Sequence, residues 1–75
     1  MKTIKLGYEG EEALLLCREL KRNGYSVKEN RTFTQEMKEA VIDFQQKNKL
    51  DADGIVGYRT WEVLFLQGYP ITETV

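Results

Sequence analysis

One structural pattern occurs twice in this 75-residue chain, and it limits the possible folds more than any other feature. The clearer copy covers residues 50–64, where a polar turn with two glycines leads into an apolar-periodic segment. A weaker copy lies 23 residues earlier, over residues 30–41. The two copies align Asp53 with Asn30, Val56 with Phe33, and Gly57 with Thr34. Each copy predicts a polar turn, a single buried apolar residue and the beginning of a helix.

The spacing of apolar residues predicts three helices, over residues 9–23, 35–48 and 58–67. In the first two, apolar residues recur at positions i, i+3, i+4 and i+7, the pattern of one buried helical face. The predicted core positions are Ala13, Leu16, Cys17 and Leu20, then Met37, Ala40, Val41 and Phe44, and then Trp61, Val63, Leu64 and Phe65. Three short helices joined by turns predict an all-α fold, a small three-helix bundle with two pseudo-repeated loop–helix units. One short extended piece is expected, over residues 25–27.

Residues at the predicted helix ends support this assignment. Gly24 is expected to end the first helix in the left-handed conformation, and Thr34 is a good N-cap for the second. Gly57 is expected to need open space or an unusual φ, so that replacing it would cost stability. The lone cysteine, Cys17, lies on the apolar stripe and is expected to be buried and unreactive.

The composition fits one globular domain over residues 1–75, with its core over about residues 4–67. Residues 68–75, which include Pro70, are expected to form a C-terminal tail. The net charge is −1 without a basic stripe, so no nucleic-acid partner is expected. Without histidine, and with one cysteine, we expect no metal, no cofactor and no catalytic residues. No apolar run approaches the roughly 20 residues that span a bilayer, so no membrane insertion is expected. The first residues, 1–7, are too short and too polar for a signal peptide, which indicates either a protein that is not exported or a domain of a longer one.

Several short motifs follow one another along the chain. They are Gly7-Tyr8-Glu9-Gly10, Leu16 and Leu20 with Gly24-Tyr25, Ala40-Val41 with Phe44-Gln45, Leu50, Asp53-Gly54-Ile55-Val56-Gly57, and Thr60-Trp61 with Leu64. This series resembles the peptidoglycan-binding domain type 1 family, small three-helix modules attached to bacterial and phage cell-wall enzymes. The resemblance extends from about residue 4 to residue 66. The first repeat departs from the family pattern, because it lacks both glycines and the threonine.

The resemblance implies a non-catalytic module that binds peptidoglycan, either its glycan strand or its peptide stem, and targets an attached cell-wall enzyme. It implies a place in the cell envelope or outside the cell, with a catalytic domain in cis as a partner. We expect a monomer with a shallow groove between the two repeated loops, and weak binding. The alternative is a protein-interaction or spacer domain that keeps the fold and has lost wall binding, which the departures in the first repeat favour.

Two exposed pairs are candidates for ligand contact. Tyr58 and Arg59 lie outside the apolar pattern beside the better-preserved loop. A tyrosine ring can stack on a sugar, and a guanidinium can pair with a peptide-stem carboxylate. Asn30 and Arg31 are the corresponding pair in the first repeat. A solvated surface without a ligand explains both pairs equally well.

Three further candidates have structural alternatives. Gln45 either ties a loop backbone group with its amide or faces the groove. Asp53 can present a carboxylate to a ligand, although a bond to its own turn backbone is the simpler interpretation. Trp61 can stack on a sugar, although a core position is favoured because large aromatic residues dominate small cores.

Overall fold

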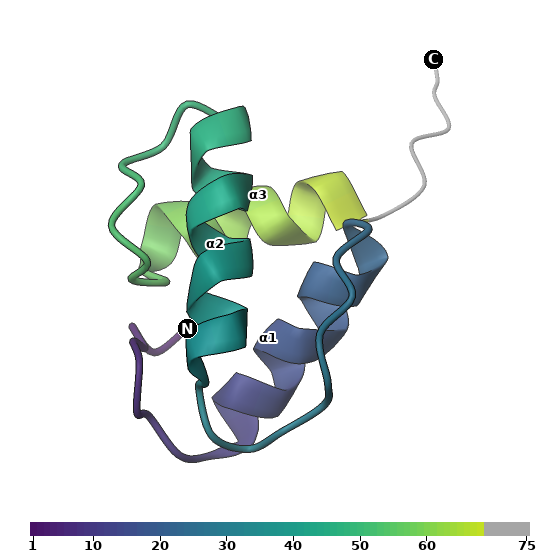
Figure 1. The fold of residues 1–75 in the computed structure, drawn as a ribbon. Coiled ribbons are helices and arrows are strands. Elements are labelled where there is room, and N and C mark those ends of the chain that lie inside the picture. Colours follow the sequence, from purple (N-terminus) through teal and green to yellow (C-terminus); the bar gives the residue numbers. More distant parts are fainter. Residues whose placement is uncertain (69–75) are drawn as a thin grey trace.

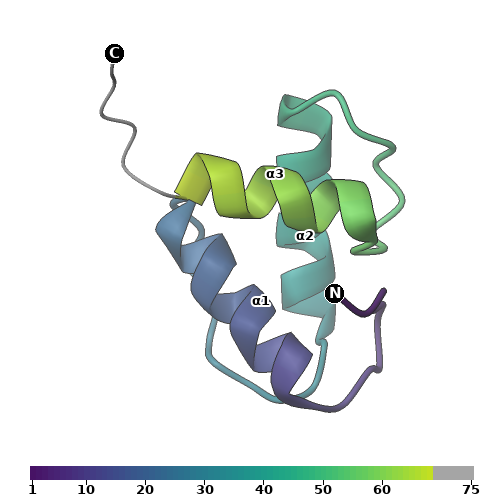
Figure 2. The same ribbon diagram turned by 180° about the vertical axis from the view of Figure 1, so that it is seen from behind.

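The computed structural model describes residues 1–68, which form α1 (Glu11–Arg22), α2 (Gln35–Lys47) and α3 (Tyr58–Gly68). Figures 1 and 2 show α3 crossing α2 and α1 inclined to both. The predicted all-α, three-helix fold is confirmed. None of the described helices is both long and apolar enough to cross a membrane. Gly68 is the last residue of α3, and the rest of the predicted tail, with Pro70, lies outside the described residues.

The segment before α1 fixes both repeated loops through backbone hydrogen bonds. Ile4 and Val56 exchange two bonds, with N···O distances of 3.1 and 2.8 Å. Further along the segment, the Gly7 amide donates to the Phe33 carbonyl at 2.9 Å, and the Phe33 amide donates to the Tyr8 carbonyl at 2.8 Å. Val56 and Phe33 are both fully buried. Their predicted equivalence is confirmed, because each is an apolar residue fixed by both of its backbone groups to one segment.

The polar turns before these two buried residues also match. The Asn30 side-chain oxygen accepts a hydrogen bond from the Thr32 amide at 2.9 Å. The Asp53 carboxylate accepts one from the Ile55 amide, also at 2.9 Å. Bonds of this kind, in which a side-chain oxygen accepts from the backbone amide two residues further on, stabilise a tight turn. The backbone interpretation of Asp53 is therefore confirmed.

The predicted residues end α1 and begin α2. Gly24 has φ of 94°, and the Tyr25 amide reaches back to the Leu20 carbonyl at 3.0 Å. This bond belongs to the Schellman motif, which satisfies a carbonyl that the helix leaves without a partner. At the start of α2, the Thr34 hydroxyl accepts a hydrogen bond from the Met37 amide at 3.3 Å.

Helix α1 begins at Glu11, two residues later than predicted. Glu9 is paired with Thr32 in an isolated antiparallel bridge, and Gly10 turns the chain with φ of 156°. Because residues 9 and 10 lie against the first loop in this conformation, they cannot be part of the helix. Residues 25–27, predicted as a short extended piece, do not form a strand with the rest of residues 1–68.

Buried side chains from the three helices and both loops form one hydrophobic cluster. Its members are Ile4, Ala13, Leu16, Cys17, Leu20, Val27, Phe33, Met37, Ala40, Val41, Phe44, Val56, Trp61 and Leu64. Val63 and Phe65 are half-buried and pack against it. The predicted core faces of α1 and α2 are confirmed, since all eight of their predicted residues are buried.

The expectation for Gly57 was wrong. Its φ is not positive, and a Cβ placed on it would lie 3.8 Å from the Thr3 hydroxyl, an ordinary contact. Gly54 carries the constraint instead, with φ of 77° and a Cβ position only 2.9 Å from two carbons of Lys38. The first of these conditions alone strains an L-amino acid, because its Cβ would be crowded by its own backbone.

We predict that Gly54→Ser lowers the free energy of unfolding by about 1–3 kcal/mol, because serine would have to adopt a left-handed conformation there. Gly57→Ser should change it by less than about 0.5 kcal/mol, because serine is well suited to the position before a helix. Urea denaturation of the two variants checks this difference. Equal losses would show that the positive φ of Gly54 is not the constraint on this loop.

We predict that Cys17 reacts slowly with a thiol reagent in the native protein. Its side chain is fully buried, and this burial raises the pKa of the thiol. Because only an accessible thiolate reacts, labelling in denaturant should be faster by on the order of a hundredfold or more. Comparing the two labelling rates by mass spectrometry is the measurement, and rapid native labelling would contradict the packing of α1 against the first loop.

Candidate functional site

A shallow hollow of about 220 Å³ lies between the second repeated loop and the first turn of α3. We call it the loop hollow. Its lining residues are Gln45, Asp51, Asp53, Ile55, Gly57, Tyr58, Arg59 and Thr60. Figure 1 shows this loop in green, curving outward from the end of α2 to the start of α3.

One buried side chain of α2, Gln45, fixes the loop that lines the loop hollow. Its amide oxygen accepts a hydrogen bond from the Gly54 amide at 2.9 Å. Its amide nitrogen donates to the Ile55 carbonyl at 3.0 Å and lies 3.1 Å from the Thr60 hydroxyl and 3.3 Å from the Asp53 carboxylate. Gln45 is 1% exposed, so these contacts supply the partners that a buried amide requires. Of the two interpretations of Gln45, the loop tie is therefore confirmed.

The rim of the loop hollow offers groups that are free to meet a ligand. Tyr58 is 72% exposed, and Ile55 is 38% exposed. Neither the Arg59 guanidinium nor the Asp51 carboxylate has a hydrogen-bond or ion-pair partner among residues 1–68. An aromatic ring, an apolar side chain and two open charges thus lie side by side.

The structure brings four of the seven predicted site residues to the loop hollow. They are Gln45, Asp53, Tyr58 and Arg59. Gln45 and Asp53 fix the loop through hydrogen bonds, and Tyr58 and Arg59 lie in the first turn of α3.

The corresponding pair in the first repeat does not join this group. Asn30 uses its side chain in a turn, and the Arg31 guanidinium forms an ion pair with Glu11. Neither residue lines the loop hollow, so the site is not the groove between two loops that the sequence predicted. The physical reason is that the two loops pair with different parts of the N-terminal segment, one at Ile4 and the other at residues 7–9.

Trp61 belongs to the core, which corrects its inclusion among the ligand-binding candidates. It is 2% exposed, and its ring stacks on Phe65 with 5.8 Å between ring centroids. Its indole nitrogen donates to the Lys2 carbonyl at 2.9 Å. The ring face is therefore not available to a sugar.

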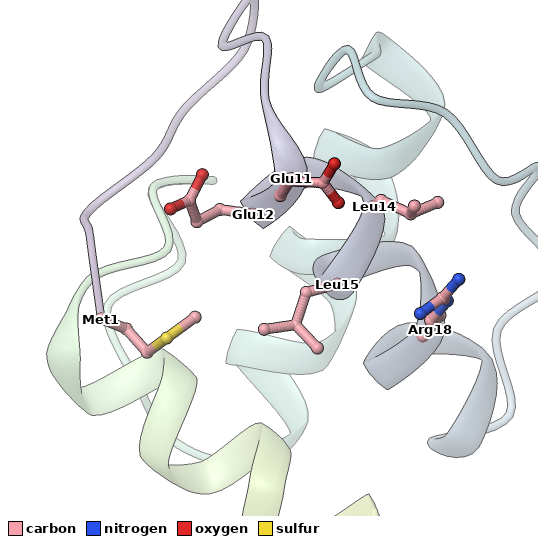
Figure 3. Close-up of a pocket in the computed structure, with 6 residues that line it drawn as sticks. All are labelled: Met1, Glu11, Glu12, Leu14, Leu15 and Arg18. Carbon is pink, nitrogen blue, oxygen red and sulfur yellow. The ribbon is translucent and has the colours of Figure 1, made fainter.

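A second hollow, of about 300 Å³, lies against the outer side of α1, and the sequence did not point to it. We call it the helix hollow. It is lined by Met1, Glu11, Glu12, Leu14, Leu15 and Arg18. Figure 3 shows Leu15 near its centre, with Met1 on one side and Arg18 on the other. The signal in the sequence was the pair Leu14 and Leu15, which extends the apolar stripe of α1 beyond its buried face.

Hydrogen bonds and ion pairs fix the charges around the helix hollow. The Tyr8 hydroxyl donates to the Glu12 carboxylate, and this bond lowers the pKa of Glu12 and raises that of Tyr8. Glu12 is therefore ionised and Tyr8 is protonated at neutral pH. Glu11 is paired with Arg31. Within residues 1–68, no three His, Cys, Asp or Glu side chains gather closely enough to hold a metal ion.

We predict that Gln45→Ala lowers the free energy of unfolding by about 2–4 kcal/mol, because it leaves the buried Gly54 amide without a partner and opens a cavity. The matched control is Gln46→Ala, the same change at the exposed neighbouring position, which should cost less than about 0.5 kcal/mol. Urea denaturation followed by circular dichroism measures both. Similar losses in the two variants would mean that the loop does not depend on this amide.

Several solved structures share this fold. The chain superposes on the Burkholderia AP3 phage endolysin with a TM-score of 0.84 and 34% sequence identity, covering 87% of this chain and 25% of the endolysin chain. For the SleB N-terminal domain the TM-score is 0.86 and the identity 32%, covering 91% of this chain and 94% of that domain. The third structure is a periplasmic domain of the EpsAB fusion protein of the Vibrio vulnificus type II secretion system. Its TM-score is 0.80 and its sequence identity 30%, and the match covers 88% of this chain and 30% of that one.

The chain therefore spans about a quarter of the endolysin and nearly all of the SleB N-terminal domain. A family model described as "Putative peptidoglycan binding domain" matches residues 9–64. That range contains both repeated loops, all of α1 and α2, and the buried part of α3. With three quarters of its length inside the match, the chain belongs to this family of peptidoglycan-binding domains.

Proposed function

We propose that the loop hollow is the site at which this chain binds peptidoglycan, and that the chain thereby holds an attached cell-wall enzyme on its substrate. Membership of a family described as a peptidoglycan binding domain supports a location at the cell wall or outside the cell. The chain itself supplies binding and no catalysis in this proposal. The observation that carries the choice of site is the pairing of the exposed Tyr58 ring with the unpaired Arg59 guanidinium at one rim.

These two side chains match the chemistry of the wall polymer. Peptidoglycan presents sugar rings, whose C–H faces pack against aromatic rings, and carboxylates, which pair with guanidinium groups. Tyr58 and Arg59 are adjacent in the first turn of α3, so both can reach one repeating unit. Because Gln45 fixes the loop beside them, little conformational freedom is lost when a ligand binds.

Binding at so shallow a site is expected to be weak. An attached enzyme would still benefit, because even modest affinity raises its concentration near the wall. The similarity to part of a phage endolysin supports a role of this kind, since the remainder of that protein lies outside the matched region.

The alternative is a protein-interaction or spacer domain with the same fold. Two observations favour it. The first loop lacks the glycines of the second, and its exposed Arg31 is committed to Glu11. In addition, a domain of a type II secretion system protein shares the fold.

We predict that Tyr58→Ala and Arg59→Ala each weaken co-sedimentation with purified insoluble peptidoglycan by about threefold to tenfold, the ratio expected when one stacking or charged contact is lost. Neither variant should lower the free energy of unfolding by more than about 0.5 kcal/mol, because both side chains are exposed. The matched control is Lys28→Ala, which removes one exposed positive charge from the other loop and should leave sedimentation unchanged.

Two further measurements can contradict the proposed function: the salt dependence of sedimentation, and the sedimentation of the unmodified domain. Binding that persists at moderate ionic strength indicates a shaped site, whereas general charge attraction would be screened. If the intact domain fails to sediment with peptidoglycan at low salt and high protein concentration, wall binding is excluded and the interaction or spacer function is supported.

A further inference from the structure

The two exposed rim residues of the loop hollow, Tyr58 and Arg59, lie between two points at which the start of the chain holds the second repeat. The first point comes just before them, where Ile4 and Val56 exchange backbone hydrogen bonds of 3.1 and 2.8 Å. Figures 1 and 2 both show the purple start of the chain beside the green beginning of α3. The rim residues are therefore tied to the chain start on their N-terminal side.

The next contacts extend this attachment across the first turn of α3. A Cβ placed on Gly57 would lie 3.8 Å from the Thr3 hydroxyl oxygen, so the Thr3 side chain lies against the last residue before the helix. The second point comes just after the rim residues, where the Trp61 indole nitrogen donates to the Lys2 carbonyl at 2.9 Å. The Trp61 amide donates to the Gly57 carbonyl, also at 2.9 Å, which closes the turn between the two points.

Residues 2–4, which we call the N-terminal strap, thus fix both ends of one helical turn. Neither Tyr58 nor Arg59 has a side-chain hydrogen bond or ion pair among residues 1–68. The placement of both side chains therefore depends on the backbone of this turn. Gln45 holds the same turn from the side of α2, through its contact with the Thr60 hydroxyl at 3.1 Å. The strap is a second tie, from a different part of the chain.

We propose that the N-terminal strap positions Tyr58 and Arg59 for the ligand of the loop hollow, with Lys2 as the positioning residue through its carbonyl. This inference rests on the proposed function, because it assigns to the strap the preorganisation of the same site. Side chains that are fixed before binding lose less conformational freedom when the ligand arrives. The site thus has its full affinity while the strap is attached and a lower affinity when the strap opens.

The strap can open without unfolding the rest of the domain. Chain ends open at a lower free energy than core helices do. Residues 1–3 are exposed, and Ile4 is the first buried residue. Coupling between two equilibria is reciprocal, so if attachment of the strap favours binding, binding must favour attachment by the same factor.

Deletion of residues 1–3 tests the proposal, because it removes the Lys2 carbonyl and keeps Ile4. We expect co-sedimentation with purified insoluble peptidoglycan to weaken about threefold to tenfold, since the ligand must then order the two side chains itself. The fluorescence emission of Trp61, the only tryptophan in the chain, should shift to longer wavelength as its indole meets water. Circular dichroism should show that the helices remain.

The matched control is Lys2→Ala, which removes the same positive charge and keeps the carbonyl that accepts from Trp61. The Lys2 ammonium lies over the Tyr8 ring, 5.3 Å from its centroid, so the side chain and the carbonyl of Lys2 make separate contacts. Sedimentation and Trp61 emission should both stay unchanged in this variant. Equal weakening in Lys2→Ala and in the deletion would overturn the assigned function of the carbonyl.

Hydrogen exchange of the unmodified protein supplies a test that holds even if the deletion prevents folding. Saturation with peptidoglycan fragments solubilised by a muramidase should slow exchange of the Ile4 amide, which bonds to Val56, by about threefold or more relative to the Phe33 amide. Phe33 is the comparison because the first loop is anchored to residues 7 and 8 instead. Equal slowing of the two amides would indicate general stabilisation of the fold and would overturn the inference.

Failure of the strap and failure of the proposed function give different results. If the unmodified domain sediments with peptidoglycan and the folded deletion variant sediments equally well, the positioning function is wrong and the proposed function stands. If the unmodified domain does not sediment at all, the proposed function is wrong, and the positioning function that rests on it is overturned as well.

Discussion

Backbone pairing between the N-terminal segment and the two loops is the constraint on which the rest of the structure depends. Ile4 fixes Val56, and residues 7 and 8 fix Phe33, so each loop is anchored at its one fully buried apolar residue. Loops of this length would otherwise sample many conformations, at a cost in entropy for each residue ordered on folding. With both anchors in place, α2 and α3 each begin two residues after a fixed point.

The fold was predictable because its determinants are local or periodic. Helical spacing identified the buried faces, and the duplicated turns gave the starts of α2 and α3. The start of α1 was not predictable in this way, because it depends on Glu9 pairing with a loop more than twenty residues away. The prediction of which glycine is conformationally constrained was wrong for a related reason. Gly54 is the glycine in the left-handed region, and its amide donates to the Gln45 side chain on α2, a contact that the spacing of the two glycines does not reveal.

Residues of the candidate site could be predicted where a side chain lay outside the apolar pattern of the core and had no other evident structural function. Tyr58 and Arg59 were found by this reasoning, and they do line the loop hollow. Trp61 could not be separated from them by sequence, since its burial depends on the N-terminal segment that covers it and accepts its hydrogen bond. Alignment of the repeats also suggested that Asn30 and Arg31 share the site, yet similar turns need not face the same surface. The helix hollow involves charges from α1 and a residue near the start of the chain, a combination that periodicity does not detect.

Around the second loop, the side chains that fix the backbone conformation are different from those that point outward. Gln45, Asp53 and Thr60 are occupied with the loop itself, whereas Tyr58 and Arg59 make no side-chain hydrogen bond among residues 1–68. A mutation at either outward position can therefore alter the rim of the loop hollow at little cost in stability. Such a division allows the scaffold to diversify: the surface encoded by two neighbouring codons at the start of α3 can change, while the shape of the loop is inherited unchanged.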